Sequence, residues 1–194
     1  KRKHVIAVCL YIGCRYTKYP LLLIDFAMTL KEKLYDLANC YLKLLSLLHL
    51  NEQTVPQVDP SIFLHKYCKK LEFGEKTGEV SRTALKIIQC MNRDWITTGR
   101  RPTGLCGAAI LIAARYHGFK RSIPQIVKSV HACDETIRKR IIEFSQTEVA
   151  RLTREEFEND GDKKITIEAD PPSFIRNRLK EGDLKRLKNI EGEL

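Results

Sequence analysis

The chain has 194 residues, 43% of them hydrophobic, and carries a formal net charge of +10 at pH 7. This is enough apolar material to bury one large or two small domains, and the chain contains neither a membrane-spanning apolar run nor a signal peptide. The positive excess lies in residues 1–150, with 24 Lys/Arg against 13 Asp/Glu, whereas residues 151–194 hold 10 against 11. A basic body of this kind suggests a polyanionic partner, although a solvated basic surface without such a partner accounts for the charge equally well.

The first part of the chain is predicted to be helical from the spacing of its apolar residues and the positions of Pro and Gly. Helices are expected at 3–17, 21–30 and 32–49. The first is almost wholly apolar, which is typical of a helix buried on all sides. The chain starts Lys-Arg-Lys-His without a Met, so we expect an excerpt of a longer protein. Either upstream helices or a partner would then cover the first helix.

The middle of the chain, after a linker expected at 51–59, is predicted to hold five further helices. Asp59 is expected to cap the first of them and Asp134 the last. The third is rich in Gly and Ala, and small side chains let neighbouring helices approach closely. The expected ranges are 60–72, 75–97, 103–117, 122–130 and 134–147. No strand is predicted, so the expected fold class is all-α.

The sequence contains an internal repeat with a period of 100 residues. The segment Val5-Ile-Ala-Val-Cys-Leu-Tyr-Ile-Gly-Cys-Arg-Tyr16 returns as Leu105-Cys-Gly-Ala-Ala-Ile-Leu-Ile-Ala-Ala-Arg-Tyr116. The apolar pattern then keeps its register to about residue 45, as expected for a duplicated unit. We therefore expect two copies of one helical module. Residues 1–50 would hold only its last three helices, and residues 60–150 would hold all five.

Residues 151–194 differ from the two repeats in composition. A short helix is expected at 151–157 and a weakly extended, charged segment at 161–169. From Pro171-Pro172 onward, charges alternate and apolar anchors are few, so this segment buries too little surface to fold alone. We expect an extended C-terminal arm or a helix that forms on a partner.

The strongest local pattern is a helix-turn-helix over residues 122–147, with a short helix, a tight turn and a longer helix. In such motifs the N-terminal residues of the second helix reach base edges, and nearby cations hold phosphates. The candidate DNA-binding residues are Arg138, Lys139 and Arg140 at the expected exposed start of the second helix, Lys120 and Arg121 before the first helix, and Arg100 and Arg101 in an earlier turn. Glu135 lies at the same helix tip and would repel phosphate. A charged, solvent-facing surface on an ordinary helical hairpin is the alternative interpretation.

A second basic cluster lies in the helix expected at 60–72. It consists of Lys66, Lys69 and Lys70. The cluster fits an acidic protein surface or DNA, and a solvated helix face explains it equally well.

No catalytic or metal site is predicted. The seven cysteines include no Cys-x2-Cys pair, which argues against a zinc ribbon, and their odd number is typical of a reducing compartment. The five histidines are scattered along the chain. The segment 98–102 lacks the glycine spacing and the Lys-Ser/Thr pair of a phosphate-binding loop. We therefore do not expect an enzyme.

Three separated motifs follow one another along the chain: Cys9-Leu-Tyr-Ile-Gly-Cys-Arg15, Gly99-Arg-Arg-Pro102 and Asp134-Glu-Thr-Ile-Arg138. In this order and spacing they resemble the transcription factor IIB family. Within that family, residues 98–109, 39–45 and 170–174 resemble the TFIIB-related factors of RNA polymerase III, which are subunits of TFIIIB. The resemblance covers residues 1 to about 176.

The resemblance implies a nuclear, non-enzymatic scaffold with two cyclin-like repeats of five helices each. It implies that the repeats bind TATA-binding protein on promoter DNA and recruit RNA polymerase III with other TFIIIB subunits, without a membrane or small-molecule partner. It also implies a zinc ribbon and two helices upstream of residue 1, and no cofactor in this part of the chain. A polymerase II-type transcription factor IIB and a cyclin-type kinase-regulatory subunit are the alternatives.

The resemblance also implies roles for individual residues. Arg138 takes the place of the family's DNA-contacting arginine, and the basic cluster at 66–70 matches a region that meets TATA-binding protein and other acidic partners. Two positions depart from the family pattern. Glu135 stands where transcription factor IIB has an apolar base-contacting residue, and Tyr19-Pro20-Leu21 replaces a Pro-Arg that contacts downstream DNA.

Overall fold

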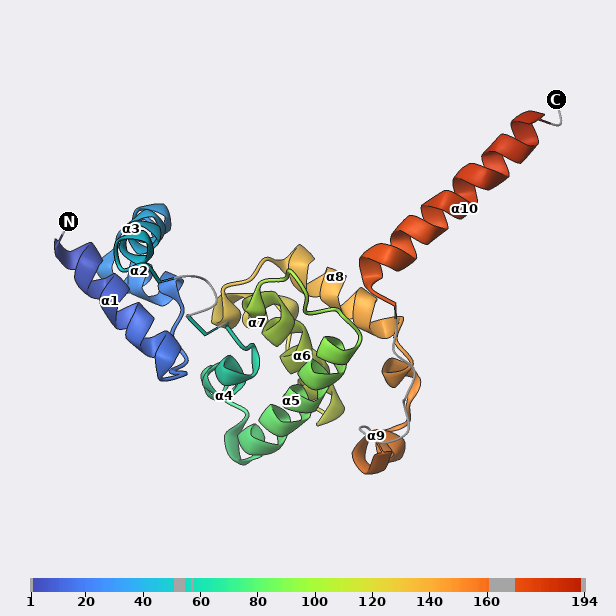
Figure 1. Cartoon of the computed structure of the whole chain (residues 1–194). Helices are drawn as coiled ribbons and strands as arrows, with labels where there is room; N and C mark the ends of the chain where they lie inside the picture. Colours follow the sequence, from blue (N-terminus) through green and yellow to red (C-terminus); the bar gives the residue numbers. More distant parts are fainter. Residues whose placement is uncertain (1, 51–54, 57, 161–169, 193–194) are drawn as a thin grey trace. The chain divides into compact units, whose positions relative to one another are not determined.

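The computed structural model describes residues 2–50, 55–56, 58–160 and 170–192 (Figure 1). Every regular element among them is a helix, which confirms the expected all-α class. The chain divides into two compact units, Lys1–Lys66 and Tyr67–Leu194. Their boundary falls inside helix α4 (Ser61–Lys70), after the segment 51–59 that we expected to be a linker.

Unit 1 is built from α1 (Arg2–Tyr16), α2 (Leu23–Leu30), α3 (Leu34–Leu47) and the first turns of α4. Apolar residues at helical spacing bring one side of each of the first three helices together, because this removes their side chains from water. The core consists of Ala7, Ala27 and Leu37, with Leu23, Phe26 and Leu30 packed against it. Tyr11 of α1 adds edge-to-face contacts with Phe26 and Tyr41, at ring-centroid distances of 6.2 and 5.5 Å.

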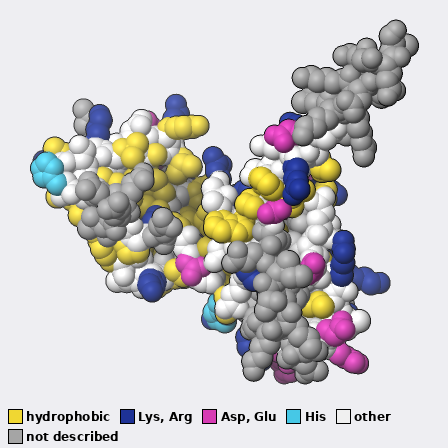
Figure 2. Space-filling view, turned by 45° about the vertical axis from the view of Figure 1, so that its right-hand side comes forward, with side chains coloured by type: hydrophobic (Ala, Val, Ile, Leu, Met, Phe, Trp, Pro, Cys, Tyr) yellow, Lys and Arg dark blue, Asp and Glu magenta, His cyan; other side chains and the backbone are white. Residues whose placement is uncertain are grey.

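Within this chain the first helix is buried on one side only, and we expected upstream helices or a partner to cover the rest of it. Ala7, Val8, Tyr11 and Ile12 of α1 are buried, but its other apolar side chains are not. Ile6 is 60% exposed and Leu10 is 58% exposed. Hydrophobic side chains accordingly cover much of the visible face of unit 1 in Figure 2. The physical reason is that α2 and α3 cover one side of α1, and no described helix of this unit packs closely on the other.

Unit 2 contains α5 (Thr77–Arg93), α6 (Pro102–Tyr116), α7 (Ile123–Val130) and α8 (Asp134–Ser145). Helix α6 is at its centre and packs on the other three helices. Its residues are buried almost without interruption from Gly104 to Ala114. Short 3-10 helices at Gly74–Lys76 and Val149–Arg151 precede α5 and follow α8.

The helix bounds confirm the repeat and its period. Helices α1 and α6 begin at residues 2 and 102 and end at 16 and 116, and α2 and α7 span 23–30 and 123–130. Even the cap geometry recurs, since Lys31 and His131 end these short helices in the left-handed conformation, with φ of 54° and 56°. The Asp25 carboxylate accepts a hydrogen bond from the Leu22 N–H at 2.8 Å, and the Gln125 side chain accepts one from the Ser122 N–H at 3.1 Å.

Two expectations about helix ends are wrong and one is confirmed. Asp134 does not cap α8, because the N-cap residue is Cys133 and the Asp134 carboxylate instead accepts a hydrogen bond from Arg138. Helix α5 ends at Arg93 rather than 97, and Trp95 follows it with a φ of 58°. Asp59 does cap α4, since its carboxylate accepts a hydrogen bond from the Ser61 N–H at 2.9 Å.

The C-terminal part of the chain contains α9 (Arg154–Asp160) and α10 (Pro172–Gly192). Of the two expectations for the tail, an extended arm is therefore wrong for residues 172–192, which form a helix. The segment 161–169, expected to be weakly extended, lies outside the described residues. Within the part of the chain that the structure describes, no helix has both the length and the apolar composition that crossing a membrane requires.

Tyr116 attaches α9 to the end of α6, and this contact gives a testable pH dependence. Its hydroxyl donates a hydrogen bond to Glu158 at 2.7 Å. Burial of the hydroxyl is the larger cause, and the Glu158 carboxylate the second, of a rise in the pKa of Tyr116 from 10.0 to about 12. The protonated phenol therefore favours the folded state, and its contribution to stability is lost as the pH rises from 10 through 12. We expect an ultraviolet difference titration of the wild type against Tyr116→Phe to show a midpoint near 12. A midpoint near 10 would contradict the contact.

Candidate nucleic-acid interface

Helices α7 and α8 form the helix-turn-helix that the sequence predicted. At the start of helix α7 the Gln125 side chain accepts a hydrogen bond from the Ser122 backbone N–H at 3.1 Å, as in one half of a capping box. The helix ends at His131, whose left-handed conformation turns the chain toward α8. Ile137 and Phe144 are buried on the inner side of α8. Because these contacts fix the rotation of α8, the opposite side of its first two turns faces solvent.

The exposed start of α8 carries two ion pairs, each between residues four apart. Arg138 Nε lies 3.0 Å from Asp134 Oδ2, and Lys139 Nζ lies 2.7 Å from Glu135 Oε1. The Arg138 and Lys139 side chains are 59% and 62% exposed. The Lys139 hydrogen bond and charge lower the pKa of Glu135, so this carboxylate remains ionised at neutral pH. We call these four residues the α8 tip.

Arg140 is not at the exposed helix end where we expected it. Its side chain is 8% exposed, and Nη1 lies 3.0 Å from Oε2 of Glu143, one turn further along α8. The same carboxylate lies 3.2 Å from Arg100, which comes from the loop before α6. Arg176 of α10 approaches it at 4.0 Å. The Glu143 carboxylate therefore holds Arg140 and Arg100 inside unit 2.

The remaining predicted cations also divide into side chains bonded within the chain and side chains exposed to solvent. Arg121 donates to the Glu72 carbonyl at 2.9 Å, and its guanidinium lies 5.4 Å from the centroid of the Phe73 ring. Lys120 and Arg101 are exposed. Lys120 and Arg101 therefore remain accessible to a partner, whereas Arg121 fastens the turn before α7 to the segment after α4.

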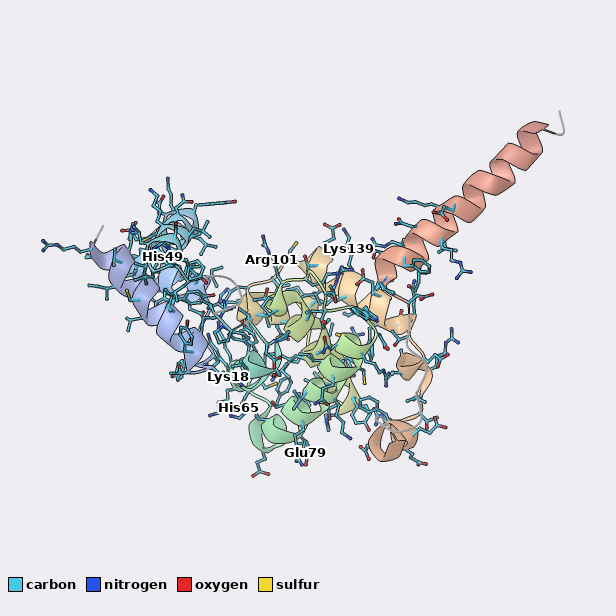
Figure 3. All side chains as sticks on the ribbon, in the orientation of Figure 1. Lys18, His49, His65, Glu79, Arg101 and Lys139 are labelled. Carbon is cyan, nitrogen blue, oxygen red and sulfur yellow. The ribbon has the colours of Figure 1, made fainter. Side chains whose placement is uncertain are left out.

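Arg101 lies at the same end of unit 2 as the α8 tip. It is the N-cap residue of α6. A Cβ built on Gly104, in the first turn of α6, would lie 2.8 Å from Thr136 in the first turn of α8, so these two helix ends are in contact. Figure 3 accordingly shows Arg101 and Lys139 along one edge of unit 2, opposite to Glu79 of α5. Two helix N-termini and three exposed cations thus share one surface, and helix N-termini attract phosphate.

Two further charged residues of α7 and α8 were not in the sequence-based set. Lys128 is exposed on α7. The only signal for its exposure in the sequence was its spacing from Ile126 and Val130, which are buried. Glu143 positions Arg140, and their separation of three residues on one helix was the available signal.

The second basic cluster is only partly free. Lys66 forms an ion pair with Asp25 of α2, with 2.8 Å between Nζ and Oδ2. Lys70 Nζ donates to the Ser129 carbonyl at 3.3 Å. Lys69 is exposed at the end of α4. Among the described residues, no three His, Cys, Asp or Glu side chains gather into a group that could hold a metal ion.

Residues 53–147, which include α4 to α8, match the family model for the transcription factor TFIIB repeat. The whole chain is 42% identical to the transcription factor IIIB 90 kDa subunit of Homo sapiens. The chain belongs to the transcription factor IIB family. The repeat of this family is a cyclin-like helical fold, and α4 to α8 form one such repeat.

Several relatives that cover nearly the whole chain carry TFIIIB names. The match to the human subunit covers 100% of this chain and 29% of the human protein. The transcription factor IIIB 70 kDa subunit of Saccharomyces cerevisiae is 39% identical over 95% of this chain and 30% of its own length. Transcription initiation factor IIB of Pyrobaculum islandicum is 32% identical over 73% of this chain. These relatives are transcription factors, and the chain spans about a third of the length of the TFIIIB subunits.

Proposed function

We propose that this chain is part of a TFIIIB subunit that acts in the nucleus as a general transcription initiation factor. It binds TATA-binding protein and promoter DNA, and with other TFIIIB subunits it recruits RNA polymerase III. The observation that carries this proposal is the similarity to TFIIIB subunits along the full chain, including the segment after the second repeat. The archaeal factor matches only 73% of the chain.

The surface formed by Arg101, Arg138 and Lys139 supports DNA binding. The helix-turn-helix places the first turn of α8 at the surface, where the equivalent turn of related motifs contacts DNA. These cations are exposed, and phosphate attracts them whatever the base sequence. We therefore assign phosphate binding to these three side chains first. Lys120, before α7, is a further exposed candidate, and Glu143 holds Arg100 and Arg140 within unit 2.

Lys69 is the member of the second basic cluster that best fits a contact with an acidic face of TATA-binding protein. It is exposed at the C-terminal end of α4, while Lys66 and Lys70 bind Asp25 and the Ser129 carbonyl within the chain. Lys66 and Lys70 would take part by holding α4 in place or by exchanging their present bonds for the partner's carboxylates.

A gel-shift series on TATA-box DNA, with and without TATA-binding protein, tests the proposal. We expect weak binding of the chain alone and much tighter binding to the complex with TATA-binding protein, because bent DNA and protein then share the interface. The double variant Arg138→Glu/Lys139→Glu should weaken that complex about tenfold or more. It should also reduce the slope of log K against log salt by roughly one to two.

The matched control is Lys76→Glu/Arg82→Glu, which makes the same charge change at exposed positions before and on α5. We expect this control to bind within about twofold of the wild type. Affinity that is independent of both TATA-binding protein and salt would overturn the proposal. An equal loss in both double variants would show that net charge, rather than the α8 tip, is responsible.

A further inference from the structure

The α8 tip has no net charge, although the chain as a whole is strongly basic. Asp134 and Glu135 occupy the first turn of the helix, and Arg138 and Lys139 occupy the second. Each acid lies four residues before its base, which is the order that favours ion pairing along a helix. The N–O distances of 3.0 and 2.7 Å show that both pairs are formed. The two most exposed cations of the predicted DNA-binding helix are therefore already paired within the chain.

The two carboxylates also lie in the first turn of α8, at the helix end that would attract a DNA phosphate. The N-terminal end of a helix carries partial positive charge and unpaired N–H groups, and it attracts anions. Neither carboxylate caps the helix, but their negative charges oppose a phosphate that approaches this end. A phosphate that approaches Arg138 or Lys139 competes with the paired carboxylate for the charge of that cation, and it remains close to the second carboxylate. Binding at this surface thus gains less than binding to unpaired cations would.

We propose that Asp134 and Glu135 are specificity-determining residues that lower the affinity of this chain for bare duplex DNA. They act through Arg138 and Lys139, whose positive charges they partly neutralise. Stable binding then requires additional contacts supplied by a protein already on the DNA, which disfavours the far more numerous sites without such a protein. This inference rests on the proposed function, because it requires that the α8 tip meets DNA.

The variants Asp134→Asn and Glu135→Gln test the inference, because they keep side-chain size and remove charge. Exposed pairs of this kind are worth little, so each variant should tighten binding to a bare, non-promoter duplex by about two- to fivefold, and the double variant by about tenfold. The slope of log K against log salt should become steeper by about one for each cation released. Fluorescence anisotropy with a labelled duplex, between 50 and 200 mM salt, measures both quantities.

A charge-matched control separates this effect from a general gain of positive charge. The double variant Glu75→Gln/Glu155→Gln changes the net charge equally at exposed positions outside α8. We expect its affinity for bare DNA to stay within about twofold of the wild type. An equal gain in both double variants would overturn the inference, and so would unchanged affinity and salt slope in Asp134→Asn/Glu135→Gln.

A double-mutant cycle shows whether the acids act through their paired bases. In an Arg138→Gln background, Asp134→Asn should no longer tighten binding, whereas a full gain there would contradict the inference. Promoter complex formation with TATA-binding protein in excess competitor DNA completes the test. The Asp134→Asn/Glu135→Gln variant should be captured by the competitor more than the wild type. If Arg138→Glu/Lys139→Glu loses the complex but the competitor does not capture Asp134→Asn/Glu135→Gln, the inference is refuted and the proposed function still stands.

Discussion

Replacing Glu143 with Gln should lower the free energy of unfolding of unit 2 by about 3 kcal/mol. The Glu143 carboxylate is 14% exposed and faces the guanidinium groups of Arg140 and Arg100, which are 8% and 23% exposed. Two positive groups in a desolvated site repel one another once the carboxylate is neutral. Removing one member of such a buried group costs far more than an exposed ion pair contributes, because the remaining charges stay buried without compensation.

Urea unfolding followed by tryptophan fluorescence measures this loss. Trp95 is the chain's single tryptophan and lies in unit 2, so its signal reports on that unit alone. The control Glu148→Gln removes the same charge from an exposed position nearby and should change stability by less than about 0.5 kcal/mol. The variant Arg140→Met/Glu143→Met should be more stable than Glu143→Gln, since apolar side chains replace a buried pair at little cost. Equal stability of Glu143→Gln and wild type would refute this account.

Gly107→Val should destabilise unit 2 by about 3 kcal/mol, because α6 and α8 touch at this residue. A Cβ on Gly107 would lie 2.9 and 3.1 Å from Cδ1 and Cγ1 of Ile137, whose side chain is fully buried. Ile126 of α7 stands 3.6 Å away on the same side, which limits the room for Ile137 to move. The branched Val side chain must therefore push α8 away from α6. Because α8 carries the proposed DNA contact, the complex with TATA-binding protein should weaken as well.

The internal repeat supplies a control glycine. Gly13 lies inside α1, where a Cβ would meet no atom within 4 Å, and the repeat places Ala113 at the equivalent position. Gly13→Ala should stabilise unit 1 by about 0.5–1 kcal/mol, since alanine loses less backbone freedom in a helix. Thermal unfolding followed by circular dichroism measures both variants. Gly107→Val as stable as the wild type would contradict the tight packing of α6 against α8.

The helices could be predicted from the sequence because the information for them is local. Periodic apolar residues, Pro near helix starts and the repeat fixed most helix bounds to within a few residues, and the register between α1 and α6 holds without a gap. The errors arose where several local solutions compete. Asp134 is a good capping residue in isolation, but Arg138 one turn away binds its carboxylate. The charged tail can form a helix or an extended arm by composition alone, and the structure shows the helix.

The candidate site could be predicted only in outline, and the charged residues show why. From the sequence, Arg138 and Arg140 are equivalent: both lie near the start of α8, two residues apart. Two residues along a helix correspond to about 200° of rotation, so their side chains face opposite sides. Burial of Ile137 and Phe144 then decides that Arg138 faces solvent and Arg140 faces the interior.

The sequence by itself determined the all-helical class, the two repeats, the helix-turn-helix and the basic character of the chain. All of these follow from composition and from spacing within a single segment. The tertiary structure alone decided that Lys66, Arg100 and Arg121 are held within the chain, because their partners come from distant segments. Lys66 binds Asp25 across 41 residues of sequence, Arg121 binds the Glu72 carbonyl across 49, and Arg100 reaches Glu143. Such a bond to a distant segment keeps a cation within its unit, and which cations are held in this way is a property of the packed helices.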